Sequence, residues 1–146
     1  MASLRMLGAK EGYYDPTNWK ECQCIDQILD AWVDIHDKFY EVAMFMQGTA
    51  QEKNVKMQEY IEKLHHPVLK FMEDNLGKNG GPYLAGKKLT IADFAMAAFL
   101  LSAWEAEGGP FVAQFKGPLS QYPKVTAYNL KLRETLAETI KRVAAE

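Results

Sequence analysis

The sequence predicts an all-α protein, a helical bundle folded as one domain. Apolar residues recur at three- and four-residue steps over long stretches, which is the period of an amphipathic helix. Glycine and proline are concentrated at a few breaks between these stretches, and no segment alternates as a half-buried strand does. The chain has 146 residues, 48% of them hydrophobic, which is enough apolar material for one buried core.

Composition and charge exclude several classes of partner. The net charge of −2 does not suit a polyanion, so no nucleic-acid partner is expected. The longest apolar stretch, residues 94–104, is far shorter than the roughly 20 residues that span a bilayer, so no membrane contact is expected. Cys22 and Cys24 lie two residues apart and face different sides of a helix, which disfavours a disulfide and favours a cytoplasmic location.

A first long helix is expected to begin at Thr17 or Asn18, which are both good N-cap residues, and to continue to about Met46. Gly48 then ends it. The residues that carry its helical period are Ile25, Ile28, Leu29, Trp32, Val33, Ile35, Phe39, Tyr40 and Ala43.

A second long helix is expected from about Ala50 to Leu76. Pro67 lies inside it and should kink it, because proline lacks a backbone N–H and clashes with the preceding turn. A short linker joins the two long helices, which favours an antiparallel pair.

The central helix of the bundle is expected to start at a capping box, Thr90-Ile-Ala-Asp93, with Asp in the position where Glu or Gln is usual. The residues that follow are apolar nearly all round as far as Trp104, which is typical of a helix buried on every side.

Three shorter helical segments complete the prediction. Residues 2–10 should form a short helix, residues 111–115 a helical turn, and a last helix should begin at Gln121-Tyr-Pro123. The apolar stripe of the last helix consists of Val125, Tyr128, Leu132, Leu136, Ile140 and Val143.

The segment Tyr83-Leu-Ala-Gly-Lys-Lys-Leu-Thr-Ile-Ala-Asp93 resembles the "YLxGxxLTxAD" stretch of the glutathione transferase C-terminal domain. In that family the capping box starts the core helix. Residues 25–34 resemble the first helix of that domain, most closely in the alpha and sigma classes, and Tyr122-Pro-Lys-Val resembles the family's "FPxL". The resemblance covers essentially the whole chain.

Residues 2–14 resemble "AIxRYLGxKxGxY", the segment that closes the family's thioredoxin-like domain, with Met6 where an aromatic residue is common. The resemblance therefore implies that residues 1–14 are the end of that domain plus a linker, and that residues 15–146 are the helical domain. The Glu/Gln-Ser pair that holds glutathione would lie just before this segment, where Met1 stands. We expect the glutathione-activating half to be absent, no catalytic residue in this chain, and no cofactor apart from glutathione as a co-substrate.

Asp34 matches the position from which alpha- and sigma-like transferases reach across a dimer to the amine of glutathione. A carboxylate suits this contact because the ligand offers an ammonium group. The alternative is a solvated charge that pairs with Lys38 one turn further on.

The resemblance also implies that Phe39, Tyr40, Met44 and Trp104 lie in the region that lines the pocket for the electrophilic substrate. Methionine and aromatic side chains suit an apolar, adaptable pocket. The alternative for each residue is a place in the core, because an aromatic stripe at helical spacing is most often core.

No metal site is expected. Glu62 and His65 have the three-residue spacing used in di-iron bundles, but such sites need a second Glu-x-x-His pair, which the sequence lacks.

Two functions remain open. The chain can contribute the electrophile pocket and dimer contacts to glutathione conjugation while being inactive alone. It can also be a non-catalytic helical module for protein interaction and assembly. Either way, we expect a homo-oligomer or a protein partner that covers an exposed apolar face.

Overall fold

The computed structural model describes residues 1–100 and 112–144, and over these ranges it consists of helices and loops without a strand. The all-α class predicted from the sequence is confirmed. None of the helices in the described part of the chain is long and apolar enough to cross a membrane.

The first arm of the molecule is helix α2 (Trp19–Tyr40), which runs into a π-helical turn, η1 (Glu41–Phe45). The N-cap is Asn18, whose side-chain oxygen accepts a hydrogen bond from the Glu21 N–H at 3.4 Å. The helical conformation ends at Met46, where the backbone becomes extended. Both predicted limits of this long helix are confirmed.

The second arm is a continuous rod of three segments, α3 (Ala50–Tyr60), η2 (Ile61–His65) and α4 (His66–Lys78). The disturbance expected from Pro67 takes the form of the π turn. In η2 the His66 N–H donates to the Ile61 carbonyl, five residues back, immediately before the proline in the first turn of α4. The wider turn accommodates a residue that cannot donate to the helical ladder.

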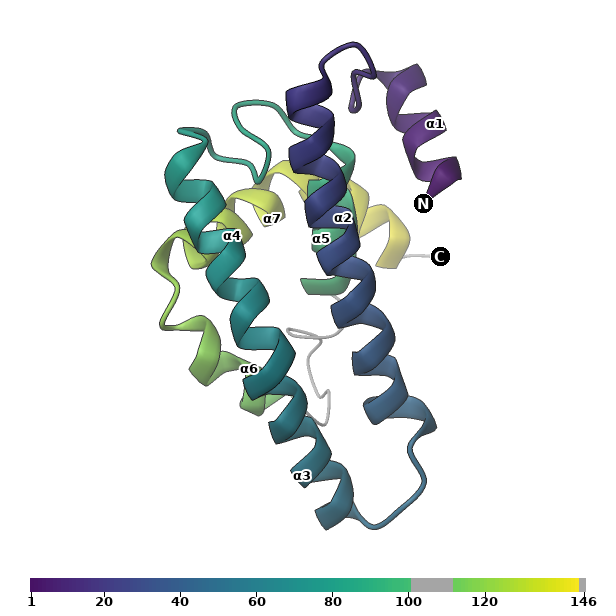
Figure 1. Ribbon diagram of the computed structural model, residues 1–146, viewed down its shortest axis with the longest axis vertical. Helices are drawn as coiled ribbons and strands as arrows, with labels where there is room; N and C mark the ends of the chain where they lie inside the picture. Colours follow the sequence, from purple (N-terminus) through teal and green to yellow (C-terminus); the bar gives the residue numbers. More distant parts are fainter. Residues whose placement is uncertain (101–111, 145–146) are drawn as a thin grey trace.

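The two arms form the antiparallel pair that the sequence predicts (Figure 1). Their connection turns at Gly48, whose φ of 139° lies in the region that favours glycine. Thr49 and Glu52 then form a capping box at the start of α3, with the Thr49 N–H donating to Glu52 Oε2 at 2.8 Å.

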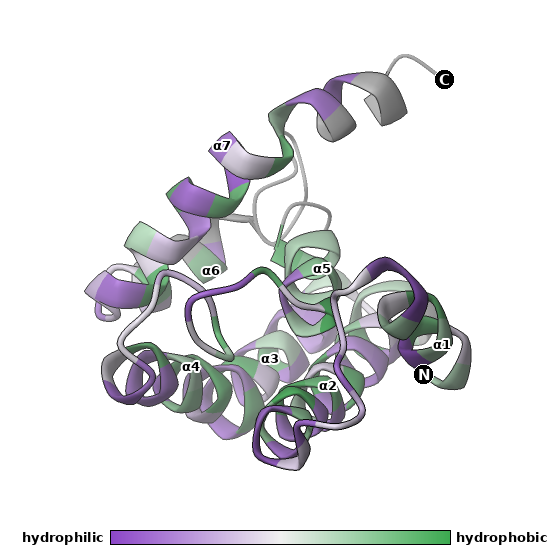
Figure 2. Cartoon of the chain, turned by 90° about the horizontal axis from the view of Figure 1, so that it is seen from above, coloured by the Kyte–Doolittle hydropathy of each residue, from purple (hydrophilic) through white to green (hydrophobic). Residues whose placement is uncertain are grey.

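Helix α5 (Ile91–Phe99) is the central helix, and it packs against α2, α1 and α7. Figure 2 shows it above the layer that α2, α3 and α4 form. Its buried residues are Ile91, Ala92, Asp93, Ala95, Met96, Ala97 and Phe99. The extension predicted as far as Trp104 lies outside the described residues.

The side chain of Asp93 is completely buried and accepts four hydrogen bonds. Its Oδ2 accepts from the N–H and the hydroxyl of Thr90, at 2.8 and 2.9 Å, so the predicted reach of Asp93 back to the cap is confirmed. Its Oδ1 accepts from the Leu84 N–H at 3.0 Å and from the Tyr128 hydroxyl at 3.1 Å. Burial raises the pKa of Asp93 above 3.8, and the hydrogen bonds offset only part of that rise.

Two further helices, α6 (Val112–Leu119) and α7 (Pro123–Ala144), follow the segment that is not described. The start of α7 is capped by a neighbouring helix, because Glu73 of α4 accepts hydrogen bonds from the N–H groups of Lys124 and Val125, each at 3.0 Å. The predicted apolar stripe faces the core over the first turns of α7, where the buried members are Val125, Tyr128 and Leu132. After its first turns, α7 extends away from the other helices (Figure 2).

Helix α1 (Ala2–Glu11) packs on α5 through Gly8, where a Cβ atom would overlap the side chain of Ile91. Arg5 Nε also donates to Asp26 Oδ1 of α2 at 2.8 Å. These contacts hold α1 against the bundle. Its assignment to the end of another domain stays a prediction.

Replacing Asp93 with Asn should lower the free energy of unfolding by about 2 to 4 kcal/mol, because an amide cannot accept from all four buried donors. The difference between the two proteins should also depend on pH. Since folding raises the pKa of Asp93 above 3.8, the carboxyl stabilises the fold most below that pH, and this contribution is lost as the pH rises through the folded-state pKa.

Urea unfolding of both proteins from acid to neutral pH measures this difference. The stability advantage of the wild type should be largest at the acid end. An advantage that grows towards neutral pH would contradict a raised pKa.

Candidate functional site

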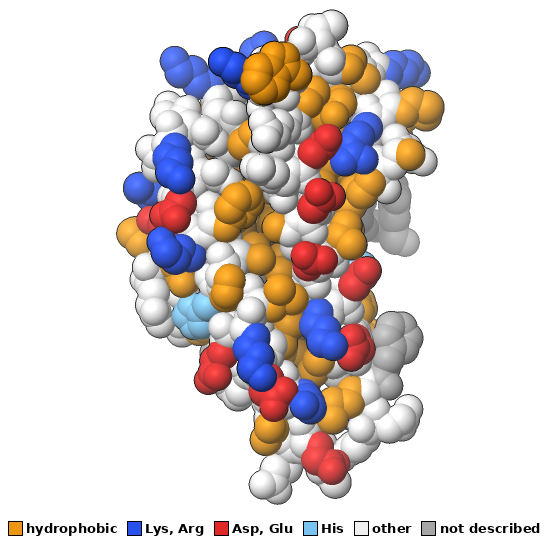
Figure 3. All heavy atoms as spheres, viewed as in Figure 1, with side chains coloured by type: hydrophobic (Ala, Val, Ile, Leu, Met, Phe, Trp, Pro, Cys, Tyr) orange, Lys and Arg blue, Asp and Glu red, His pale blue; other side chains and the backbone are white. Residues whose placement is uncertain are grey.

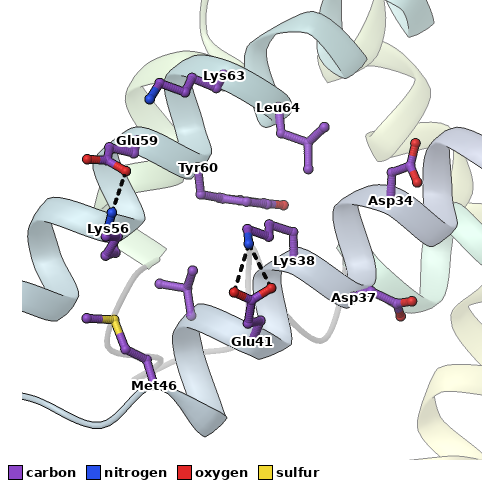
Figure 4. A pocket seen from close by; sticks show the side chains of 11 residues that line it. Asp34, Asp37, Lys38, Glu41, Met46, Lys56, Glu59, Tyr60, Lys63 and Leu64 are labelled. Atoms are coloured by element: carbon purple, nitrogen blue, oxygen red, sulfur yellow. Dashed lines mark hydrogen bonds and ion pairs between the residues drawn. The ribbon is translucent and has the colours of Figure 1, made fainter.

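A groove of about 800 Å³ lies between the two arms of the molecule, where α2 and η1 face α3 and η2 (Figure 4). Its size lies within the roughly 300 to 1,000 Å³ that ligand pockets commonly have. Figure 3 shows apolar side chains along the gap between the arms, with charged side chains on both sides of it.

The floor of the groove is apolar and is centred on Tyr60, which is 4% exposed. Val42, Met46 and Leu64 extend this floor on either side. The Tyr60 hydroxyl donates to the backbone carbonyl of Ile35 at 3.2 Å, so one side chain ties α3 to the middle of α2.

Both walls of the groove contain a π-helical turn. Glu41 and Val42 belong to η1, and Lys63 and Leu64 belong to η2. π turns are rare and are often found at functional sites, because they shift the helical register and redirect side chains.

Two ion pairs lie at the rim of the groove. Lys38 Nζ contacts both carboxylate oxygens of Glu41, at 2.8 and 2.7 Å, and Lys56 Nζ contacts Glu59 Oε2 at 2.9 Å. The hydrogen bond from Lys56 lowers the pKa of Glu59. These four charges are largely neutralised within their own helices.

Asp34 lies at the α2 rim of the same groove, and its side chain is exposed (Figure 4). The alternative expectation, a pair with Lys38, is wrong, because the Lys38 ammonium binds Glu41 instead. No residue in the described part of the chain forms an ion pair with Asp34. Its carboxylate is therefore available to a cation from outside.

The residues expected in the electrophile pocket differ in burial where the structure describes them. Phe39 is 7% exposed and packs in the core, with its ring centroid 5.4 Å from that of Phe99. Tyr40 is partly buried, and Met44 is 67% exposed. None of the three lines the groove, and Trp104 lies outside the described residues. Their roles in a pocket stay predictions.

A row of three rings follows the side of α2 that faces away from the groove. The His36 ring lies between those of Trp32 and Tyr40, stacked on Trp32 and tilted by 41° to Tyr40, with ring centroids 4.7 Å apart on each side. His36 Nδ1 lies 3.0 Å from Asp37 Oδ1. Trp32 was expected only as part of the helical period, and His36 was not expected at a site. Steps of four residues, from 32 to 36 to 40, place all three rings on one side of a helix.

Glu62 and His65 do not share one environment, because Glu62 is exposed whereas His65 is completely buried. Burial lowers the pKa of His65 to about 3, so its imidazole is neutral at neutral pH. Within the described ranges no group of three or more His, Cys, Asp or Glu residues is arranged to hold a metal ion. Cys22 and Cys24 are free thiols.

A comparison with known protein families identifies the family of this helical domain. The family described as glutathione S-transferase, C-terminal domain, matches residues 33–141, which include the end of the first arm, the whole second arm and the capped central helix. The chain therefore belongs to the glutathione S-transferase C-terminal domain family. No curated protein matches the chain.

Two solved structures share the fold. The glutathione S-transferase Blo t 8 is similar with a TM-score of 0.76 and 23% identity, over 96% of this chain and 61% of that chain. NaGST-2 is similar with a TM-score of 0.64 and 24% identity, over 94% of this chain and 66% of that chain. The chain thus spans less than two thirds of the length of either structure.

Replacing Tyr60 with Phe should lower the free energy of unfolding by about 1 kcal/mol, because the Ile35 carbonyl loses a buried donor while the ring packing remains. Tyr40→Phe is a matched control, since the Tyr40 hydroxyl makes no hydrogen bond to any described residue. It should change stability by less than about 0.5 kcal/mol. Equal urea midpoints for the two variants would show that the Tyr60 bond does not hold the arms together.

Proposed function

We propose that this chain is the helical part of a glutathione-conjugating transferase, to which it contributes dimer contacts and an apolar pocket for the electrophile. The observation that carries this proposal is the position of Asp34, an exposed carboxylate at the rim of an apolar groove. An ammonium group is the natural partner of such a carboxylate, and the amine of glutathione supplies one.

The face that holds the groove is the proposed dimer interface. Its floor, centred on Tyr60 and Leu64, offers apolar surface, and its rim carries charges of both signs. A two-fold dimer needs a patch that complements itself, and a face with an apolar centre and mixed charges meets that need. Asp34 would then point towards glutathione held by the partner copy.

In the parent reaction the glutathione thiolate attacks an electrophilic carbon. A carbon–sulfur bond forms and the leaving group departs with its electron pair. Tyr40 of α2 and Met44 of η1, neither of which lines the groove, would contact the apolar part of the electrophile. No residue of this chain is assigned to activation of the thiol, so we propose that the chain is inactive alone. A cytoplasmic location and an alpha- or sigma-like class are part of the same proposal.

The alternative is a non-catalytic helical module for protein interaction and assembly. The specific observation in its favour is exposed apolar surface outside the groove, since Met6 and Leu7 of α1 are 67% and 52% exposed. In that case the partner is a different protein rather than a second copy.

Native mass spectrometry of the purified chain should give a dimer, about twice the 16.6 kDa of one copy. Leu64→Glu, at the floor of the groove, should give a monomer, because it buries a charge in the interface. Val55→Glu is the matched control, since Val55 is an exposed apolar residue of α3 outside this groove, and it should stay dimeric.

A wild-type monomer would contradict the dimer interface. Recovery of the chain from its source in a complex with a different protein would support the alternative function instead.

A conjugation assay with glutathione and an aromatic chloride tests the remaining claim. We expect product to form no faster than without protein, for the wild type and for Asp34→Asn and Tyr40→Phe alike. If the wild type forms product and either variant forms it more slowly, the chain is catalytically competent by itself.

A further inference from the structure

The two walls of the groove between the arms carry opposite net charges. The wall formed by α2 and η1 has three carboxylates and one ammonium group, whereas the wall formed by the second arm has one carboxylate and two ammonium groups. These residues are Asp34, Asp37, Lys38 and Glu41 on the first wall, and Lys56, Glu59 and Lys63 on the second. The first wall is therefore net negative and the second net positive.

Three of these charges are not neutralised within their own wall. The pairs Lys38–Glu41 and Lys56–Glu59 account for the other four. Asp34 and Lys63 form no ion pair with a residue that the structure describes, and both side chains are exposed. The carboxylate of Asp37 is 74% exposed and contacts the His36 imidazole at 3.0 Å. An anionic rim and a cationic rim thus face solvent on opposite sides of the groove (Figure 4).

This charge pattern distinguishes between two ways in which a second copy can cover the groove. A two-fold axis parallel to the arms sets the α2 wall of each copy against the second arm of the other, so unlike charges meet. A two-fold axis across the arms sets each wall against the same wall of the other copy, so like charges meet. Like charges held together in an interface are unfavourable, and the pattern therefore favours the parallel axis.

We propose that a second copy packs on the groove with the two-fold axis parallel to the arms, and that Lys63 of each copy forms an ion pair with Asp37 of the other. This inference rests on the proposed function, because that function makes the groove a dimer interface. It adds the orientation of the second copy and the residues that select this orientation. Asp34 remains available to the ammonium group of glutathione.

Lys63 and Asp37 lie at similar levels along the two arms. The Tyr60 hydroxyl donates to the Ile35 carbonyl at 3.2 Å, so these parts of the arms lie beside each other. The Lys63 side chain extends back towards Glu59, as side chains lean towards the N-terminus of their helix (Figure 4). Asp37 lies only two residues beyond Ile35. An axis parallel to the arms leaves the level along the arms unchanged, so it brings the two groups together.

The apolar floor and the charged rims have different roles in this dimer. Val42, Tyr60 and Leu64 of the floor become covered in either orientation, so the floor does not select one of them. An exposed ion pair contributes little by itself. Symmetry forms this pair twice, however, and the other orientation replaces both pairs with like-charge contacts. The rims therefore determine the orientation although the floor supplies most of the buried area.

Exchanging the two charges tests the inference, with native mass spectrometry and sedimentation of the full chain at low salt. Lys63→Glu and Asp37→Lys should each raise the dissociation constant of the dimer about tenfold, because each turns two ion pairs into two like-charge contacts. An equimolar mixture of the two variants, one of them labelled with ¹⁵N, should form the heterodimer, in which both ion pairs return with exchanged signs. The variant that carries both substitutions should dimerise as the wild type does.

Lys131→Glu is the matched control, because Lys131 is an exposed lysine of α7, which does not line the groove. It makes the same change in net charge and should leave the dissociation constant unchanged. Added salt gives a second readout, since it screens attraction and repulsion alike. It should weaken the wild-type dimer and strengthen the homodimer of each single variant.

Two results would overturn the inference while the wild type is still a dimer. One is a dissociation constant that neither single variant raises, which is what an axis across the arms predicts. The other is a mixture of the two variants that contains no heterodimer. Both leave the proposed dimer interface in place. A monomeric wild type would overturn the inference together with that interface, and turnover by the chain alone would contradict the proposed function without affecting the ion pair.

Discussion

The buried carboxylate of Asp93 is the contact on which the rest of the molecule depends. A helix as apolar as α5 has no polar face to set its rotation or its start, so a specific polar contact has to do so. Asp93 binds Thr90 at the start of α5, Leu84 in the preceding loop and Tyr128 of α7. A buried charge in this position is tolerated only while every hydrogen-bond donor that contacts it remains in place.

The orientation of α5 in turn organises the candidate site. Phe99 of α5 packs edge-on against Phe39, and the Phe39 ring lies 6.1 Å from Tyr60 at the floor of the groove. Phe99 also lies 6.1 Å from His36 in the aromatic row. One aromatic core therefore supports both sides of α2. The groove side carries the proposed dimer contacts and Asp34, and the other side carries the proposed apolar pocket.

Much of this could be predicted from the sequence where the determinants are local. The start of α2 at Asn18, the capping box at Thr90 and the start of α7 at Pro123 depend on residues within one helical turn, and all three are confirmed. A kink was predicted at Pro67, because a missing N–H acts wherever the residue stands, and the structure has a π turn immediately before it. The sequence motif around Asp93 also led to the family that the comparison confirms.

Tertiary structure decided which face each side chain occupies. Phe39 and Tyr40 are neighbours in the same helical pattern, yet packing against α5 buries Phe39 in the core and leaves Tyr40 in the row with His36. Lys38 has two possible acidic partners on one helix, Asp34 four residues before it and Glu41 three residues after it, and the helical pattern alone does not decide that it binds Glu41. The sequence by itself thus determined where the helices begin and what family they form. The faces that meet, and the groove and the ring row that result, depend on contacts between residues far apart in the chain.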